Sequence, residues 1–192
     1  MKGAARWQTV SLSLATAVVS LVSVAREVSA EPTAAAGARW QAEPSVGVVT
    51  DVILGDARAI ARWTAGAELA ATARREGSPW GGHVALEAEP ATDVGPGASL
   101  SLWSARLGLE RTWVRHIVAA VDVGGTARRL SIENEVTHTA MGAGATLELG
   151  WRLLVARRAV ATVGAHYSVT RFSSDYFYWQ QAGLSLSLGL IR

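Results

Sequence analysis

Residues 140–152 read Ala-Met-Gly-Ala-Gly-Ala-Thr-Leu-Glu-Leu-Gly-Trp-Arg, and every second side chain in this stretch is apolar. In an extended strand, one face would carry Met141, Ala143, Ala145, Leu147, Leu149 and Trp151. The other face would carry small or charged side chains, among them Glu148 and Arg152. A helix with 3.6 residues per turn would mix the two sets, so the period of two predicts a β-strand. The pattern leaves open whether the apolar face packs in a soluble core or faces lipid.

The N-terminal region has the pattern of a secretory signal peptide. Lys2 and Arg6 give it a basic start, residues 10–25 are apolar or small, and residues 28–30 form a small-x-small cleavage site. We therefore expect a signal peptide over 1–30, a flexible leader over 31–39 and a single domain over 40–192. A retained membrane helix is the alternative, but the apolar run is shorter than the roughly 20 residues that a span needs.

Removal of the signal changes the charge balance of the chain. The whole sequence has 18 basic and 16 acidic residues, and the signal contains Lys2, Arg6, Arg26 and Glu27, so the mature chain is neutral. This balance, and the lack of a basic run with interleaved aromatics, argues against a nucleic-acid partner. The sequence contains no cysteine, and export without disulfides fits a protein of the bacterial envelope.

The period of two continues in eight segments that are separated by turn signals. The expected strands are 40–52, 59–73, 83–89, 99–110, 115–126, 140–152, 159–171 and 180–191. Residues 127–138 are predicted to form the longest loop, and 111–114 a tight turn. Leu100 and Leu102 fall out of phase on the polar face, and a β-bulge near Leu102 and Trp103 would restore the alternation. An even number of strands joined as neighbours predicts an antiparallel up-and-down arrangement.

Charged side chains in the middle of these segments fall on the face that also carries Gly, Ser and Thr. The opposite face is mostly Ala, Val and Leu and has no charge between its ends. A basic side chain at the lipid midplane costs about 2 to 4 kcal/mol, so a charge-free face suits a membrane barrel. The lumen would then hold an ionic network of Glu43, Arg62, Glu68, Glu87, Arg106, Asp122, Glu148 and Arg152.

Aromatic residues are also placed as a bilayer requires, because Trp and Tyr concentrate at membrane–water interfaces. In an up-and-down arrangement, one rim would carry Trp40, Trp113 and Trp151. The other rim would carry Trp63, Trp103, Tyr167 and Tyr178. Ordinary packing of Trp in a core is the alternative explanation.

With this pattern, residues 40–192 resemble the small eight-stranded outer-membrane barrels of Gram-negative bacteria. The resemblance rests on the alternation of polar and apolar residues, on the aromatic residues at the two rims and on the number of strands. No signature motif supports it. It implies an all-β, eight-stranded antiparallel up-and-down transmembrane β-barrel in the bacterial outer membrane. Outer-membrane lipids and the barrel-assembly machinery are the implied partners. The chain departs from the family at its end, where Leu190-Ile191-Arg192 replaces the usual terminal aromatic residue.

The expected role is that of a structural or interaction protein of the cell envelope, with a lumen mostly plugged by the ionic network. Charges in so narrow an interior must pair, because an unpaired buried charge is costly. Inward-facing glycines could leave a thin water path, so a small porin-like channel is an alternative. A soluble lipocalin-like binding barrel would require Leu184, Leu186 and Leu188 to face inward. The sequence does not indicate whether the loops bind an extracellular ligand.

His166 and Ser168 are the only candidates for catalysis. Residues two apart on a strand share a face, so the imidazole could activate the hydroxyl, with Asp175 orienting it. The His-x-Ser spacing resembles that of outer-membrane lipid A deacylases, but Val169 replaces the Asn that follows in that family. Two polar lumen residues are the simpler explanation, and no enzyme activity is expected. No pair of histidines has the spacing of metal ligands, so neither a metal nor a cofactor is expected.

Overall fold

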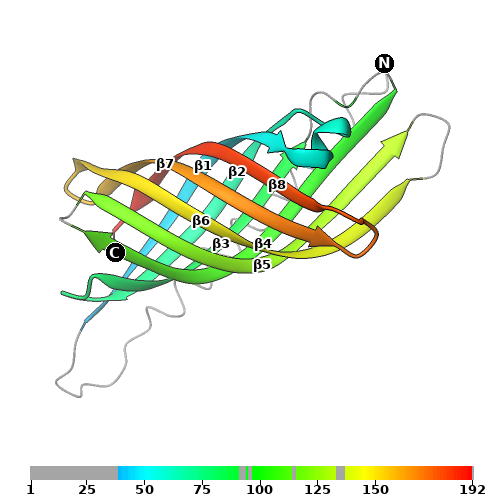
Figure 1. Cartoon of the computed structure of the whole chain (residues 1–192). Helices are drawn as coiled ribbons and strands as arrows, with labels where there is room; N and C mark the ends of the chain where they lie inside the picture. The colour runs from blue at the N-terminus through cyan, green and yellow to red at the C-terminus, as the bar shows by residue number, and fades with distance from the viewer. Residues whose placement is uncertain (1–38, 91–93, 95–96, 114–115, 133–136, 192) are drawn as a thin grey trace. The chain divides into compact units, whose positions relative to one another are not determined.

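The computed structural model describes residues 39–90, 94, 97–113, 116–132 and 137–191. The predicted signal peptide and all but the last residue of the predicted leader lie outside this part of the chain. The described chain folds as a closed antiparallel barrel in which each strand pairs with its neighbours in sequence, and β1 also pairs with β8 (Figure 1). The predicted fold class is therefore confirmed. Within the described residues, no helix is long and apolar enough to cross a membrane.

The strands are β1 (Trp40–Leu54), β2 (Trp63–Arg75), β3 (Trp80–Pro90), β4 (Ala98–Trp113), β5 (Ile117–Ile132), β6 (His138–Ala156), β7 (Ala159–Phe172) and β8 (Tyr178–Leu190). A short 3-10 helix, η1 (Gly55–Ala59), follows β1. We call the end where β1 begins and β8 ends the turn end, and the opposite end the loop end. The connections are shorter at the turn end, as in outer-membrane barrels.

The strands run further than the sequence pattern predicted. Residues 127–132 were expected to be in a loop, but they continue β5 and pair with 98–103 of β4. The predicted turn at 111–114 is also wrong in part, since β4 continues to Trp113. Backbone pairing continues past the apolar belt, where the outward side chains become polar, so the loss of hydrophobic alternation does not mark the strand ends.

The predicted bulge near Leu102 is wrong. The pairing of β4 with both β3 and β5 is continuous through Leu102 and Trp103. Leu100 and Leu102 keep the inward phase of the strand, and both are buried inside the barrel. The polar character of the inner face therefore ends near the loop end, where apolar side chains fill the lumen.

The outer face of the barrel is apolar and exposed, as the alternation predicted. On β6, the side chains of Leu147 and Leu149 are 56% and 60% exposed, whereas that of Thr146, directly before Leu147, is 3% exposed. On β8, Leu184, Leu186 and Leu188 are all outward, which is opposite to the facing that a lipocalin-like barrel requires.

Aromatic side chains lie on the outer face in two groups. The turn end has Trp40, Trp80, Trp113 and Trp151, and the loop half has Trp63, Trp103, Tyr167 and Tyr178, all exposed on the outer surface. The predicted rim residues lie at the two ends that the sequence pattern gave them, and Trp80, which lies between the expected strands 59–73 and 83–89, joins the group at the turn end.

Candidate functional site

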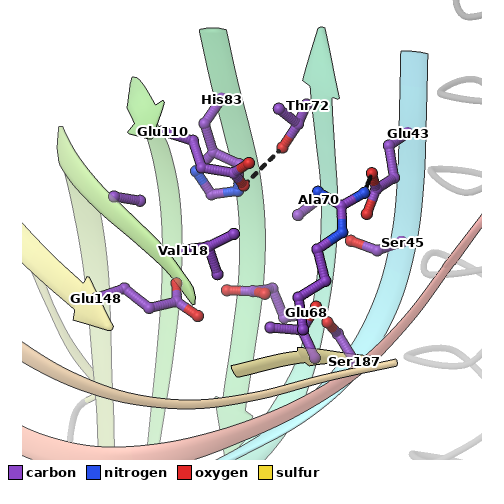
Figure 2. Close-up of a pocket in the computed structure, with 13 residues that line it drawn as sticks. Glu43, Ser45, Glu68, Ala70, Thr72, His83, Glu110, Val118, Glu148 and Ser187 are labelled. Carbon is purple, nitrogen blue, oxygen red and sulfur yellow. Dashed lines mark hydrogen bonds and ion pairs between the residues drawn. The ribbon is translucent and has the colours of Figure 1, made fainter. Parts of the chain in front are cut away.

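The barrel interior at the turn end is crossed by ion pairs. Arg152 on β6 pairs with Glu43 on β1, and Arg74 on β2 pairs with Glu110 on β4 at 2.5 Å. Figure 2 shows Glu110 accepting a hydrogen bond from the hydroxyl of Thr72, at 3.1 Å. These pairs tie together strands that are not neighbours, because inward side chains of a small barrel converge across the lumen.

One arginine in the middle of the lumen binds two carboxylates. Glu68 on β2 and Glu87 on β3 are directly paired in register, which places like charges opposite each other. Arg106, from β4, lies 2.6 Å from Glu68 and 2.9 Å from Glu87. It also donates a hydrogen bond to Thr146 at 3.3 Å. The guanidinium therefore offsets a repulsion that the strand register creates.

Histidine–aspartate pairs extend this network. His83 Nδ1 lies 3.1 Å from Asp122, and His166 Nε2 lies 2.6 Å from Asp51. The chain makes room for the second pair with Gly183 on β8, where an added methyl group would collide with the Asp51 carboxylate. Both aspartates are almost completely buried.

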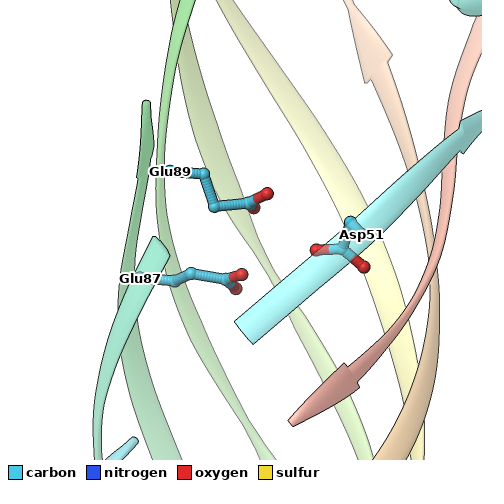
Figure 3. A group of neighbouring side chains, drawn as sticks. All are labelled: Asp51, Glu87 and Glu89. Atoms are coloured by element: carbon cyan, nitrogen blue, oxygen red, sulfur yellow. The ribbon is translucent and has the colours of Figure 1, made fainter. Parts of the chain in front are cut away.

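Three carboxylates face one another closer to the loop end. The side chains of Glu87 and Glu89 on β3 point toward Asp51 on β1 (Figure 3). Glu89 has only neutral partners among the described residues, since it accepts hydrogen bonds from the Thr64 hydroxyl and from the Gln181 amide. In the part of the chain that the structure describes, no arginine forms an ion pair with Glu89, whereas Glu87 binds Arg106.

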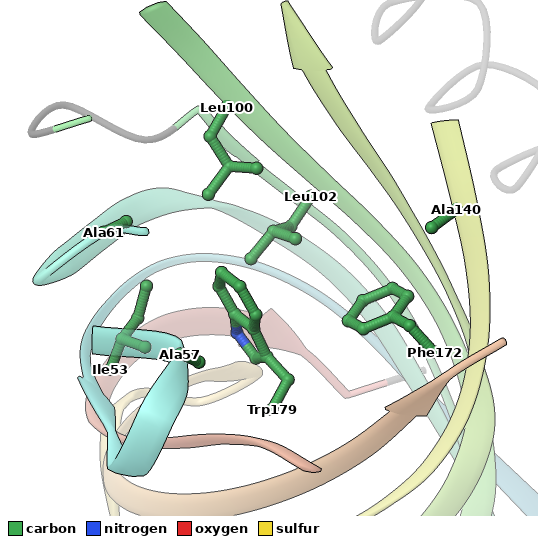
Figure 4. Packing of buried hydrophobic residues seen from close by; sticks show 8 residues of the cluster. All are labelled: Ile53, Ala57, Ala61, Leu100, Leu102, Ala140, Phe172 and Trp179. Atoms are coloured by element: carbon green, nitrogen blue, oxygen red, sulfur yellow. The ribbon is translucent and has the colours of Figure 1, made fainter. Parts of the chain in front are cut away.

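An apolar cluster closes the loop end of the lumen, and we call it the apolar cap (Figure 4). It consists of Ile53, Ala57, Ala61, Leu100, Leu102, Ala140, Phe172 and Trp179, all buried. Phe172 and Trp179 meet edge to face with their ring centroids 6.1 Å apart. Helix η1 contributes Ala57, so the connection after β1 folds inward over the lumen.

An ion pair covers the aromatic part of the cap. The Arg128 guanidinium stacks 4.5 Å from the Phe172 ring centroid and donates hydrogen bonds of 2.5 and 2.7 Å to Asp175. These hydrogen bonds hold the pKa of Asp175 below its usual value. The suggestion that Asp175 orients His166 is therefore wrong, because its carboxylate is bound to Arg128.

Most of the predicted network residues lie in the lumen. Glu43, Glu68, Glu87, Arg106, Asp122, Glu148 and Arg152 all point inward. Arg62 does not, because it precedes β2 and is exposed at the loop end. The structure shows which of these residues pair. Arg106 binds Glu68 and Arg152 binds Glu43, while Glu148 accepts a hydrogen bond from Ser185.

The network contains members that the list of candidates lacked. Arg74 lies just beyond the expected strand 59–73 and keeps its inward phase, so extending the period of two would have found it. Glu89 and Glu110 are the last residues of the expected strands 83–89 and 99–110, and both already fall on the inward face. The apolar cap has a weaker signal in the sequence. Leu100 and Leu102 break the polar pattern of the inner face, and only the structure shows that they meet Trp179 there.

The candidate catalytic residues do not form a dyad. His166 and Ser168 both line the interior of the barrel. The Nε2 atom of His166 contacts Asp51, and among the described residues no hydrogen bond joins His166 to Ser168. In this arrangement the imidazole is held by Asp51 and not by the Ser168 hydroxyl.

The space that remains inside the described barrel is small. One cavity of about 40 Å³ lies toward the turn end, beside Glu68 and Glu148. A second of about 20 Å³ lies beside Asp51, Glu87 and Glu89. Each has room for a water molecule or a few, because one water needs roughly 10 to 15 Å³ measured in this way.

Solved structures share this architecture, although no family model and no curated relative matches the sequence. Ail, the attachment invasion locus protein of Yersinia pestis, matches with a TM-score of 0.56 at 11% identity, over 79% of this chain and 98% of Ail. Ail in complex with the heparin analogue sucrose octasulfate matches with a TM-score of 0.58 at 11% identity, over 80% of this chain and 99% of that chain. The chain has the fold of the small eight-stranded outer-membrane barrels. Neisserial surface protein A also matches, with a TM-score of 0.53 at 10% identity, over 80% of this chain and 98% of that protein.

Proposed function

We propose that this barrel resides in the bacterial outer membrane, with a lumen closed to solutes, and acts as a structural or interaction protein of the envelope. The exposed Leu, Val and Ala side chains of the outer face would contact lipid, and the two aromatic groups would lie at its interfaces. Outer-membrane lipids and the barrel-assembly machinery are the partners that this placement requires.

The proposal of a closed lumen rests on one observation: an apolar cap lies at the loop end of the lumen, and ion pairs cross the lumen beneath it. The cap buries two aromatic rings and several aliphatic side chains across the loop end. Below it, Arg106 and its two carboxylates occupy the centre of the barrel. The two cavities described beside these groups, of about 40 and 20 Å³, have room only for water or a single ion.

A non-catalytic role is part of this proposal. The imidazole of His166 is held by Asp51, and the interior location of Ser168 separates its hydroxyl from a lipid substrate. A lipid hydrolase of the deacylase type would need its nucleophile on the outer, lipid-facing side. Hydrolysis of lipid by the purified barrel, abolished by Ser168→Ala, would contradict the proposal.

The test measures the stability of two arginine variants and the conductance of the parent barrel. Arg106→Met should lower the free energy of unfolding by about 3 to 5 kcal/mol, because it leaves Glu68 and Glu87 buried opposite each other without a cation. Arg62→Met is the matched control, and this exposed position should change the free energy by less than about 0.5 kcal/mol.

Planar-bilayer recording completes the experiment. The parent barrel should give no steady current, because the apolar cap and the ion pairs occupy the lumen. A steady current in the parent, together with a loss below about 1 kcal/mol in Arg106→Met, would indicate a wet lumen whose water screens the carboxylates. That result would replace the closed-barrel function with a small porin.

A further inference from the structure

The carboxylates of Asp51, Glu87 and Glu89 form a group inside the barrel that the ionic network does not neutralise. Each offers an oxygen atom, and these atoms all lie within 4.8 Å of one another. The three side chains are 2%, 7% and 5% exposed. Like charges so close together in a buried place repel strongly unless a cation or protons offset them.

The neighbouring cations are too few to neutralise the group. Among the described residues, Arg106 forms ion pairs with Glu68 and Glu87, and His166 pairs with Asp51. Four carboxylates, including Glu68, therefore share one guanidinium and one imidazole. Even with the imidazole protonated, two negative charges remain, and one divalent cation would offset both.

An oxygen atom in the group has no partner. Oε1 of Glu87 is buried and makes no hydrogen bond to the described residues, although Oε2 of the same carboxylate binds Arg106. The side chain of Glu87 points toward Asp51 and Glu89 (Figure 3). A buried carboxylate oxygen without a partner that faces two other carboxylates is well placed to bind a cation.

The geometry and the donors fit a hard cation. Ca²⁺ binds oxygen ligands at about 2.3 to 2.6 Å, so two ligands on opposite sides of one ion lie up to about 5 Å apart. The adjoining cavity of about 20 Å³ is also lined by the hydroxyls of Ser104, Thr146 and Ser168. Hydroxyls and water can complete the oxygen shell that such ions prefer.

We propose that Asp51, Glu87 and Glu89 bind one hard divalent cation, of the Ca²⁺ or Mg²⁺ class, inside the barrel. The cation would join β1 to β3 across β2 and would add to the ion pairs that brace the lumen. No metal was expected from the sequence, because no pair of its histidines has the spacing of metal ligands. This site is made of carboxylates that only the closure of the barrel brings together.

Mn²⁺ is a suitable probe because it accepts the same oxygen ligands and is visible by electron paramagnetic resonance. The full barrel should be refolded in detergent with Mn²⁺ present, since the apolar cap restricts later entry, and then freed of unbound metal. We expect about one Mn²⁺ per chain, in line with a single oxygen site. A parent barrel without bound Mn²⁺ would overturn the proposal and leave protons as the neutralising charge.

Glu89→Gln is the decisive variant, because it removes a ligand charge while keeping the size of the side chain. It should weaken Mn²⁺ binding by at least about tenfold, since even residues behind the ligands of a metal site have effects of that order. Glu148→Gln is the matched control, an interior carboxylate that lines the other cavity and bonds to Ser185. It should bind as the parent does.

Folding and binding are separated by a second measurement. The altered gel mobility of unboiled samples reports whether each variant has closed its barrel, so a variant that does not fold is recognised. Asp51→Asn gives an independent removal of a ligand charge on another strand. Retention of Mn²⁺ by folded Glu89→Gln and Asp51→Asn barrels would place the ion elsewhere and overturn the proposed site.

Discussion

At the scale of single residues, arginines of the lumen form ion pairs with carboxylates that lie beyond the adjacent strand. Arg106 lies in register with Ala85 on β3, yet its guanidinium reaches past β3 to Glu68 on β2. Arg74 likewise passes β3 to reach Glu110 on β4. Such pairs are buried, so losing one partner costs more than an exposed pair would.

Asp175 makes a pH-dependent contribution to the stability of the fold at the loop end. Arg128 lowers the pKa of its carboxyl, so the pair stabilises the fold above the unfolded pKa, near 4. That contribution is lost as the pH falls through the lower, folded pKa. Asp175→Asn should therefore reduce the free energy of unfolding by about 1 to 3 kcal/mol at neutral pH, as expected for hydrogen bonds to charged groups.

Equilibrium unfolding in guanidinium chloride, followed by tryptophan fluorescence, measures this effect. The difference measured at neutral pH should shrink at low pH, as the pH falls through the lowered pKa of Asp175 and its carboxyl becomes protonated in the folded state too. Asp56→Asn, an exposed change on η1, serves as the control. A difference that is the same at both pH values would show that the Asp175 charge is not responsible.

At the scale of elements, the strand phase was predictable and the strand ends were not. The period of two correctly assigns Leu147 outward and Thr146 inward, because the two faces of a strand meet different surroundings. Beyond the apolar belt the outward side chains of residues 127–132 include Arg129 and Ser131, and backbone pairing with β4 continues through these residues. Side-chain patterning contains no signal for hydrogen bonds that are made by the backbone alone.

The apolar cap depends on Trp179, which β8 turns into the lumen. Its side chain is 1% exposed, and its Nε1 atom has no hydrogen-bond partner among the described residues. Trp179→Ala should cost about 3 to 5 kcal/mol, because it leaves a cavity beside Phe172. Trp179→Phe should change the stability far less, since it also removes a buried N–H that costs about 1 to 3 kcal/mol when unsatisfied.

Thermal or chemical unfolding of both variants checks this prediction. Trp40→Ala is the control, because Trp40 is 70% exposed on the outer surface at the turn end. Equal losses for Trp179→Phe and Trp179→Ala would mean that the indole nitrogen is bonded in solution, and that the cap is held by this polar contact rather than by packing.

At the scale of the whole molecule, the fold was more predictable than the site. Eight alternating segments with short connections leave few topologies other than an up-and-down barrel, and the facing of each residue follows from its phase. Which charged side chains pair inside the lumen does not follow from the inward or outward phase of each residue. Arg152 meets Glu43 only after the sheet closes and brings β6 across the lumen from β1, so no local pattern could predict that pair.

Closure itself depends on close contact between β8 and β1. Gly183 lies in register with Asp51, and a methyl group added there would collide with the Asp51 carboxylate and with the carbonyl oxygen of Thr50. Gly183→Ala should therefore strain the closing ladder and destabilise the barrel by about 1 to 3 kcal/mol, as overpacking does. It should also displace Asp51 from His166.

Gly82→Ala is the matched control, because the same change on β3 meets nothing within 4 Å. The measurement is the temperature at which unboiled samples lose their altered mobility on a denaturing gel. Gly183→Ala should lose it at a clearly lower temperature than the parent, and Gly82→Ala at the same temperature as the parent. Equal behaviour of the two variants would show that β8 and β1 can separate enough to admit the methyl group. The close contact between these two strands would then not be required for closure.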